Sequence, residues 1–359
     1  MTKLCKRHIT NSQRNVPTAG RPATPAATAI MAAAITMIMV LLLAGAAAGW
    51  QPFISMGGQR AGTSSAQFLK IGVGARATAM GEAFVAIADD ASALYWNPAG
   101  AANLSGTQVH FTHTRWPAEV EYEFVGLVQQ MGSWGSLGLS FASLHMDDME
   151  VTTEYRPHGT GEYFSFGDFL GAVTYARQLT DRFSFGINLK YIQEELADLT
   201  TQGMVVDMGT FYMTGFRSLR IAANLANFGT NFRPDGTYMG YDDQGIWGER
   251  RYEAFAPPTV FRLGTAMEIL DRDDHRLTCC FAMNHPVDNA ENASLGLEYV
   301  LWNAFSARLG YKFNYDEERY TLGAGWQVPM WSSRMRIDYA YTDFGLLDAA
   351  HRFSFEFGL

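Results

Sequence analysis

The sequence predicts an all-β protein, a 14-stranded antiparallel transmembrane β-barrel with a short N-terminal helical plug. Three observations lead to this prediction. From residue 107 onward apolar and polar side chains alternate with a period of two, the pattern of strands with one apolar face. Fourteen such segments occur, an even number, and several have nine to twelve residues, long enough to cross a bilayer at a tilt. Every second connection between them is short, an asymmetry typical of outer-membrane barrels.

Residues 1–49 are predicted to be a cleaved signal peptide. Five basic residues come first, 26–49 carries no charge, and Ala46–Ala48 offers a small-residue cleavage site. The alternative is a membrane-anchoring helix, since the uncharged stretch approaches the usual span of about 20 residues. Cleavage would take the net charge from −9 to −14, and an acidic exported chain is a poor candidate for nucleic-acid binding.

Residues 50–106 are predicted to form a plug segment. Gly72-x-Gly74-x-x-Ala77 imitates a dinucleotide-binding fingerprint, but the rest of the chain lacks the alternation of strands and helices that such a site needs. A short helix is expected instead, with an apolar face at helical spacing formed by Met80, Phe84, Val85, Ile87 and Ala88. Asp89 and Asp90 end this helix, and a turn motif follows at Asn97, Pro98, Ala99 and Gly100. A tethered segment of this size can fill a wide barrel.

Residues 107–359 are predicted to form the barrel. The segment 351–359 shows the pattern well: its aromatic residues alternate with Arg352, Ser354, Glu356 and Gly358. The expected strands are 107–114, 121–131, 136–145, 165–177, 182–193, 203–213, 218–227, 259–269, 275–284, 293–301, 305–313, 319–328, 334–342 and 351–359. Glycines at alternate positions of the lumen faces would make room for something inside or let strands bend.

Several charged residues stand on the polar face of the strands, which in a barrel faces the lumen. These lumen charges are Asp207, Arg262, Glu298, Arg308 and Asp338. Mixed charges in a lumen can pair, so we expect a structural ion network, with a binding site as the alternative.

The long connection 228–258 is the candidate partner-binding loop. Aromatic and arginine side chains are typical of binding surfaces. The loop contains Tyr238, Tyr241, Trp247, Arg250, Arg251 and Tyr252. The alternative is a loop that packs on itself over the barrel mouth.

No motif for a catalytic site, a metal or a cofactor stands out, and the protein is not expected to be an enzyme. The segment 285–289 is interpreted as a turn between strands, not as a metal site. Asp147, Asp148 and Glu150 could hold calcium at a loop tip, but solvated loop acids explain them better. Cys279 and Cys280 would point to opposite faces of a strand, so they are not a redox or metal pair.

The segment "LKIGVGARATAMGEAFVAIADDASALYWNPAGAANLSG" resembles the N-terminal signature of the PorV/PorQ family of outer-membrane proteins. More distantly it is similar to the FadL family of hydrophobic-compound transporters, which shares the Asn97-Pro98-Ala99 turn. The resemblance continues through "LRIAANLANFG", "HPVDNAENASLGLEYVL" and "FSARLGYKF" and covers residues from about 60 to 359. It implies fourteen strands with an N-terminal plug. The sequence departs from barrel-assembly signals that end in an aromatic residue, because it ends at Leu359.

The PorV/PorQ resemblance implies an accessory protein of type IX secretion in the outer membrane, which would bind or shuttle exported cargo proteins at the cell surface. The alternative is a FadL-like channel for long-chain fatty acids or other hydrophobic small molecules. The partners expected are therefore outer-membrane lipid together with either secreted cargo proteins and other secretion components or a hydrophobic small molecule.

Overall fold

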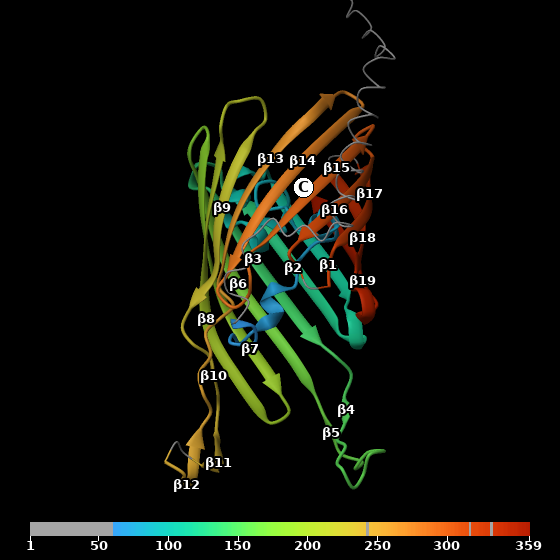
Figure 1. The fold of residues 1–359 in the computed structure, drawn as a ribbon. Coiled ribbons are helices and arrows are strands. Elements are labelled where there is room, and N and C mark those ends of the chain that lie inside the picture. Colours follow the sequence, from blue (N-terminus) through green and yellow to red (C-terminus); the bar gives the residue numbers. More distant parts are fainter. Residues whose placement is uncertain (1–59, 242–243, 316, 331–332) are drawn as a thin grey trace, which may run out of the picture. The chain divides into compact units, whose positions relative to one another are not determined.

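The computed structural model describes residues 60–359 except 242–243, 316 and 331–332. The signal peptide expected at 1–49 lies outside these described residues, as do residues 50–59 of the plug segment. Fourteen long strands form one closed antiparallel sheet whose order follows the chain, and β1 pairs with β19 to close the ring (Figure 1). The predicted fold class, a fourteen-stranded antiparallel barrel, is confirmed.

The elements follow the alternating pattern closely, and most strand boundaries differ from the expected ones by only a few residues. The barrel strands are β1 (Thr107–Arg115), β2 (Glu121–Gln130), β3 (Ser136–His145), β6 (Phe166–Thr180), β7 (Phe183–Leu196), β8 (Leu199–Met213), β9 (Arg220–Gly229), β13 (Val260–Arg272), β14 (His275–Pro286), β15 (Asn292–Leu301), β16 (Phe305–Phe313), β17 (Tyr320–Met330), β18 (Ser333–Asp343) and β19 (Ala349–Gly358). The short strands are β4 (Met149–Glu150), β5 (Tyr163–Phe164), β10 (Arg233–Pro234), β11 (Thr237–Tyr241) and β12 (Trp247–Arg251). The helices are η2 (Gln67–Lys70), α2 (Ala75–Ala79), α3 (Ala93–Trp96), η3 (Pro98–Asn103), η4 (Pro117–Glu119), η5 (Gly132–Trp134) and η6 (Gly345–Leu347). Within the described part of the chain, no helix is long and apolar enough to cross a membrane.

The outer face of the wall is apolar and the inner face carries the polar side chains. On β19, Phe353 and Phe355 are each 46% exposed, whereas Arg352 and Ser354 are buried inside the ring. The same alternation leaves leucine, valine, phenylalanine and methionine side chains exposed on the outside of most strands. An outer surface of exposed apolar side chains is stable only in contact with lipid hydrocarbon, so the wall spans a membrane.

The two ends of the barrel differ in their connections. We call the end with strand junctions at 131–135, 214–219 and 302–304 the turn end, and the opposite end the loop end. Two of the turns at the turn end expose a tryptophan, Trp134 and Trp302, a residue enriched at membrane–water interfaces. The loop end carries the two longest connections, which contain β4–β5 and β10–β12, and both lie at the bottom of Figure 1.

The connections at the loop end differ from the expectation in two places. A loop was expected at 194–202, but β7 and β8 continue through it and only Ala197 and Asp198 join them. Cross-strand pairs continue up to Leu196 opposite Leu199, so the strands extend beyond the stretch where apolar alternation marks the membrane. The long segment 228–258 likewise contains structure of its own, because β11 and β12 pair as a hairpin.

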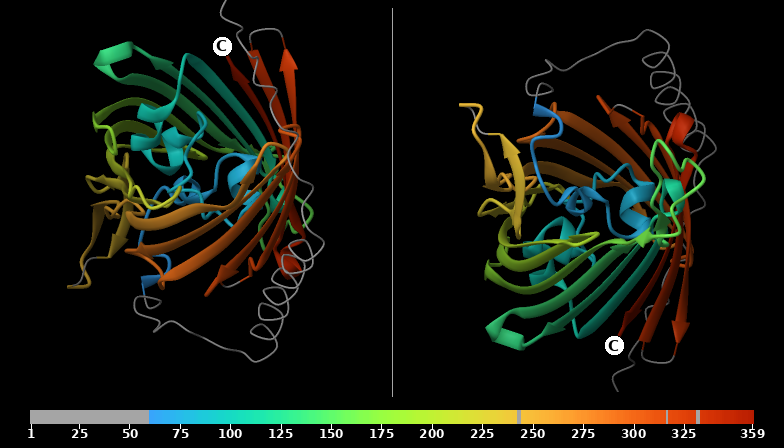
Figure 2. Two further views of the ribbon diagram at one scale, coloured as in Figure 1. Left: turned by 90° about the horizontal axis from the view of Figure 1, so that it is seen from above. Right: turned by 90° about the horizontal axis from the view of Figure 1, so that it is seen from below.

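The segment 60–106 lies inside the ring of strands, as the two end-on views of Figure 2 show in blue. α2 contacts β16 to β19, and η3 contacts β3, β6, β7 and β8. The lumen face of β2 is apolar, contrary to the simple apolar-out, polar-in expectation: Tyr122, Phe124 and Val128 face inward and are buried. They belong to one hydrophobic cluster with plug residues, which explains why this part of the wall has two apolar faces.

Candidate functional site

Glycines of the wall mark where the plug chain runs against the strands. At eight of them an added Cβ would come within 3.1 Å of a plug atom, closer than nearly all real Cβ contacts. These eight glycines, which we call the glycine seat, are Gly126, Gly138, Gly186, Gly209, Gly264, Gly296, Gly310 and Gly323. Each lies on a different strand, so more than half of the wall is shaped to the plug backbone.

The turn motif of the plug connects it to the wall. Asn97 is fully buried, and its Oδ1 accepts a hydrogen bond from the N–H of Ala99 at the start of η3. Its Nδ2 donates to the carbonyls of Val85 in the plug and Thr210 on β8, both at 3.1 Å. Pro98 follows at the first position of η3, where no N–H is needed. One side chain therefore caps a helix and joins two parts of the chain that are far apart in the sequence.

The expected apolar helix face of the plug does not form. α2 ends at Ala79, and Met80, Phe84 and Ile87 lie on successive turns instead of on one helix. The helix is interrupted because Gly81 and Glu82 adopt positive φ values of 64° and 66°. All three apolar side chains are nevertheless buried in the core that the plug shares with the wall.

Three of the five predicted lumen charges come together in one ion network. Glu298 on β15 accepts from Arg308 on β16 at 2.7 Å, and Arg308 donates to Asp338 on β18 at the same distance. The plug joins this network through Arg76 of α2, which donates to both carboxylate oxygens of Glu298 at 2.8 and 2.7 Å. The bidentate pair fixes the plug helix to the wall with good geometry.

Arg336 extends the network to a second plug residue. It donates to Asp338 at 2.8 Å, to Asp90 of the plug at 2.6 Å and to Glu356 of β19 at 2.8 Å. Burial alone raises the pKa of Asp90, but the guanidinium of Arg336, with His110 and Arg76, outweighs burial and holds this pKa below its ordinary value of 3.8. Asp90 therefore remains ionised as a fixed counterion.

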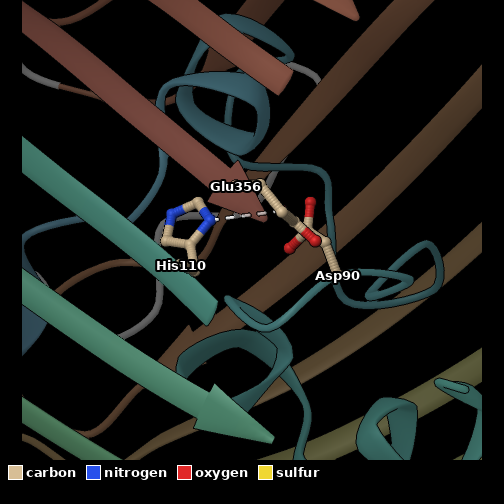
Figure 3. Close-up of side chains that lie close together, drawn as sticks. All are labelled: Asp90, His110 and Glu356. Carbon is tan, nitrogen blue, oxygen red and sulfur yellow. Dashed lines mark hydrogen bonds and ion pairs between the residues drawn. The ribbon is translucent and has the colours of Figure 1, made fainter. Parts of the chain in front are cut away.

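Asp90, His110 and Glu356 form a compact group that resembles a metal site (Figure 3). One ligand atom of each lies within 4.8 Å of the other two, and His110 Nδ1 is 3.3 Å from Glu356. The two carboxylates, however, already share the guanidinium of Arg336. His110 Nε2 is also engaged, at 2.8 Å from the Thr112 hydroxyl. We assign the group to the ion network, because its cation is an arginine side chain.

The other two predicted lumen charges lie elsewhere. Asp207 pairs with Lys190 at 2.7 Å and accepts the backbone N–H of Asn227 at 2.8 Å. That N–H belongs to a bulge, since the register of β8 and β9 shifts between Val206 and Met208. Asp207 thus satisfies a backbone group that the sheet leaves unpaired. Arg262 does not join the network either; its guanidinium lies over the rings of plug aromatics.

Plug and wall leave a cavity at each end of the lumen. The loop-end cavity has a volume of about 420 Å³ and is lined by Lys70, Glu82, Trp96, Trp116, Arg262 and Tyr315, with several asparagines. Burial raises the pKa of Tyr315 to about 12, so its hydroxyl remains protonated at neutral pH. The turn-end cavity, about 230 Å³, is lined almost entirely by the ion network and neighbouring polar groups. Of the two, the loop-end cavity has the mixture of aromatic and polar lining that small-molecule sites have.

The candidate partner-binding loop forms the β11–β12 hairpin with most of its aromatic residues exposed. Tyr238, Tyr241 and Trp247 are 44%, 70% and 55% exposed. The rings pair across the hairpin, Tyr238 with Tyr252 and Tyr241 with Trp247, at centroid distances of 5.2 and 4.7 Å. Arg250 and Arg251 lie on the same hairpin opposite Tyr238 and Thr237. The hairpin packs mainly on itself and leaves aromatic surface in solvent.

Sequence reasoning missed Arg76, Asp90, His110, Arg336 and Glu356. The last two stand at inward positions, two residues from Asp338 and Ser354, so the strand alternation contained the signal for them. Arg76 and Asp90 had no such signal, because the plug has no regular period from which a facing partner could be read.

These features define the class: a transmembrane β-barrel of fourteen strands whose lumen holds an N-terminal plug. The chain belongs to the family described as "Uncharacterised protein family (UPF0164)", whose model matches residues 44–229. Two relatives are UPF0164 proteins of Treponema pallidum (strain Nichols). One is 28% identical over 170 residues, which are 46% of this chain and 49% of the relative. The other is 32% identical over 120 residues, which are 33% of this chain and 30% of the relative. The match thus spans half or less of these relatives' length.

Solved structures with the same fold include the CymD monoaromatic hydrocarbon channel and the toluene transporter TbuX of Ralstonia pickettii. CymD is 13% identical, with a TM-score of 0.53, over 80% of this chain and 96% of its own. TbuX is 11% identical, with a TM-score of 0.52, over 80% and 97%. At this identity the likeness concerns the fold alone. It agrees with the FadL-like barrel expected from the sequence, whereas the PorV/PorQ assignment and the type IX role gain no support from these relatives and structures.

Proposed function

We propose that this protein is an outer-membrane channel that takes up small, largely hydrophobic compounds through its loop-end cavity. The observation that carries the proposal is this cavity of about 420 Å³, which opens between the plug and the wall and is lined by Trp96, Trp116 and Tyr315. Aromatic side chains with a few polar groups suit the binding of a small apolar molecule. The two solved structures with the same fold, a monoaromatic hydrocarbon channel and a toluene transporter, support the same class of cargo.

In this proposal the loop end faces outward and the turn end faces the periplasm. The long connections of outer-membrane barrels are extracellular and the short ones periplasmic. Export through a cleaved signal peptide at residues 1–49 belongs to the same proposal. A compound would enter at the loop end, and the plug would have to yield locally for it to pass, since α2, α3 and η3 pack closely on the wall.

The test fills the loop-end cavity without touching the plug contacts. Ala290 lines this cavity and belongs to the connection between β14 and β15. We expect Ala290→Trp to reduce toluene uptake by intact cells several-fold, and Ala290→Ser, which changes little volume, to leave it unaltered. Heat-dependent electrophoretic mobility confirms that each variant is an assembled barrel. Normal uptake in an assembled Ala290→Trp variant would refute the proposed route.

A second candidate function is the capture of secreted proteins at the cell surface, as a PorV/PorQ-type accessory would perform it. The exposed aromatic rings of the β11–β12 hairpin favour it, because aromatic residues dominate the binding energy of protein interfaces. Replacing Tyr238, Tyr241, Trp247 and Tyr252 by alanine separates the two functions. Lost cargo capture with normal toluene uptake would favour secretion, and normal secretion with altered uptake would favour the channel.

A further inference from the structure

Arg262 is a buried cation that has no carboxylate partner in the described part of the lumen. Its residue is 8% exposed, and it lines the loop-end cavity. Among the described residues, no carboxylate oxygen lies within 4.0 Å of its nitrogens. Its guanidinium carbon is instead 5.3 Å from the ring centre of Tyr95 and 5.5 Å from that of Trp96. Stacking of this kind offsets only part of the cost of burying a charge.

The carboxylates at and beside this cavity contact cations other than Arg262. Glu82 pairs with Lys312 at 2.9 Å, and Glu318 also contacts the Lys312 ammonium. Asp288 pairs with Lys70 at 2.6 Å. Two carboxylates thus share one ammonium, and none of the three contacts the guanidinium of Arg262.

A second guanidinium behind the cavity wall has the same character. Arg352 on β19 is fully buried, and its Nε and Nη2 have no hydrogen-bond partner among the described residues. Its guanidinium carbon lies 5.1 Å from the ring centre of Trp116, whose side chain lines the cavity. Together with Lys70 and Lys312, these two guanidiniums make four cations against the three carboxylates of Glu82, Glu318 and Asp288, and the excess of one positive charge favours the binding of an anion.

We infer that the loop-end cavity binds a compact aromatic carboxylate, with the carboxylate on Arg262 and the ring among Trp96, Trp116 and Tyr315. A guanidinium can hold a carboxylate by two parallel hydrogen bonds, which suits a planar acid. The inference rests on the proposed channel function and specifies its ligand. The inferred ligand differs from the hydrocarbon cargo of the proposed function by one negative charge, which the guanidinium of Arg262 would neutralise.

The dimensions of the cavity favour a compact molecule over a long acyl chain. Its volume of about 420 Å³ is near the lower end of the range of small-molecule sites, about 300–1,000 Å³. Beneath it Trp96 packs edge-on against Tyr95 and Phe84, with ring centres 4.8 and 6.4 Å apart. These three residues are buried in the plug core, so the floor of the cavity is closed to an extended chain.

The test compares three probes on the purified protein in detergent by isothermal titration calorimetry: benzoate, its neutral analogue benzamide, and decanoate. We expect benzoate to bind at least about tenfold more tightly than benzamide, as a charge-assisted hydrogen bond requires. Decanoate should bind more weakly than benzoate. Equal affinity for benzoate and benzamide in the native protein would overturn the inference without any variant.

Variants test whether Arg262 is the residue that distinguishes benzoate from benzamide. Arg262→Gln should lower benzoate affinity by about tenfold or more and leave benzamide affinity unchanged. The variant is expected to assemble, because Arg262 forms no ion pair with any described residue and its removal therefore leaves no described carboxylate of the barrel unpaired. Arg156→Gln, which removes an exposed charge of the loop between β3 and β6, is the matched control and should bind benzoate normally. Unchanged benzoate affinity in Arg262→Gln would refute the assignment. The proposed channel function is tested separately, by toluene uptake in cells that carry the Ala290→Trp variant.

Discussion

Gly310→Ala is expected to loosen the plug from the wall. Gly310 lies on β16, and an added Cβ would come within 2.0 Å of the Gly81 nitrogen and 2.5 Å of the Met80 carbonyl carbon. Both are backbone atoms, so no side-chain rotation can relieve the contact. Ordinary contact begins at 3.4 Å, so the plug chain must move by about 1.4 Å. Overpacking of this kind costs roughly 1–3 kcal/mol.

Hydrogen exchange of residues 75–96, followed by mass spectrometry on the purified protein, measures this loosening. Exchange protection follows the free energy of local opening, and a loss of about 1–3 kcal/mol corresponds to roughly 5- to 150-fold faster exchange. Gly171→Ala is the control, since a Cβ there meets only the rings of Phe169 and Phe141, at 3.6 Å or more. Equal exchange of residues 75–96 in the two variants would refute the view that glycines seat the plug.

Three further predictions concern the ion network and the topology. Glu298→Gln leaves Arg76 and Arg308 without their shared counterion and should lower the free energy of unfolding by about 3–5 kcal/mol in a denaturant titration. Glu253→Gln, at an exposed position, is the control and should have no effect. An equal unfolding midpoint in both variants would contradict the role of the network. Because neighbouring cations hold the pKa of Asp90 below 3.8, its contribution is complete above that pH and is lost as the pH falls further. The stability difference between native protein and Asp90→Asn should therefore be constant from pH 7 to 5 and shrink below about pH 4; a difference that disappears by pH 6 would disprove this. With Cys279 and Cys280 replaced by serine, a cysteine at Gly245 should react with an impermeant maleimide on intact cells and one at Asp273 should not, and equal labelling would reverse or reject the orientation.

The wall could be predicted from the sequence because its periodicity is local and strict. Alternation in segments such as 305–313 and 351–359 assigns each side chain to a face, and the structure has strands at Phe305–Phe313 and Ala349–Gly358. The polar face carried Glu298, Arg308 and Asp338, and neighbouring strands in an antiparallel barrel bring such residues together. For this reason three of the predicted lumen charges form one network.

The plug could not be predicted in the same way. Its shape is set by close approach to the wall, and left-handed φ at Gly81 and Glu82 interrupts the helix that spacing alone suggested. Its partners on the wall come from positions more than 200 residues away, as with Arg76 and Glu298. Likewise, the guanidinium of Arg262 looked like a member of an ion network, and only the placement of Tyr95 and Trp96 shows it stacked on rings.

The glycine seat has a consequence for biogenesis. The ring closes only when β19, at the end of the chain, pairs with β1, so the segment 60–106 is synthesised before any strand and enclosed after all of them. A wall closed without it would have eight strands lacking a side chain at their contact with the plug, and Glu298 and Arg336 would face water in place of Arg76 and Asp90 of the plug. We therefore expect the N-terminal segment to act as a template on which the strands assemble. A chain that begins at residue 107 should not reach the heat-resistant folded form even when residues 60–106 are supplied later as a separate peptide.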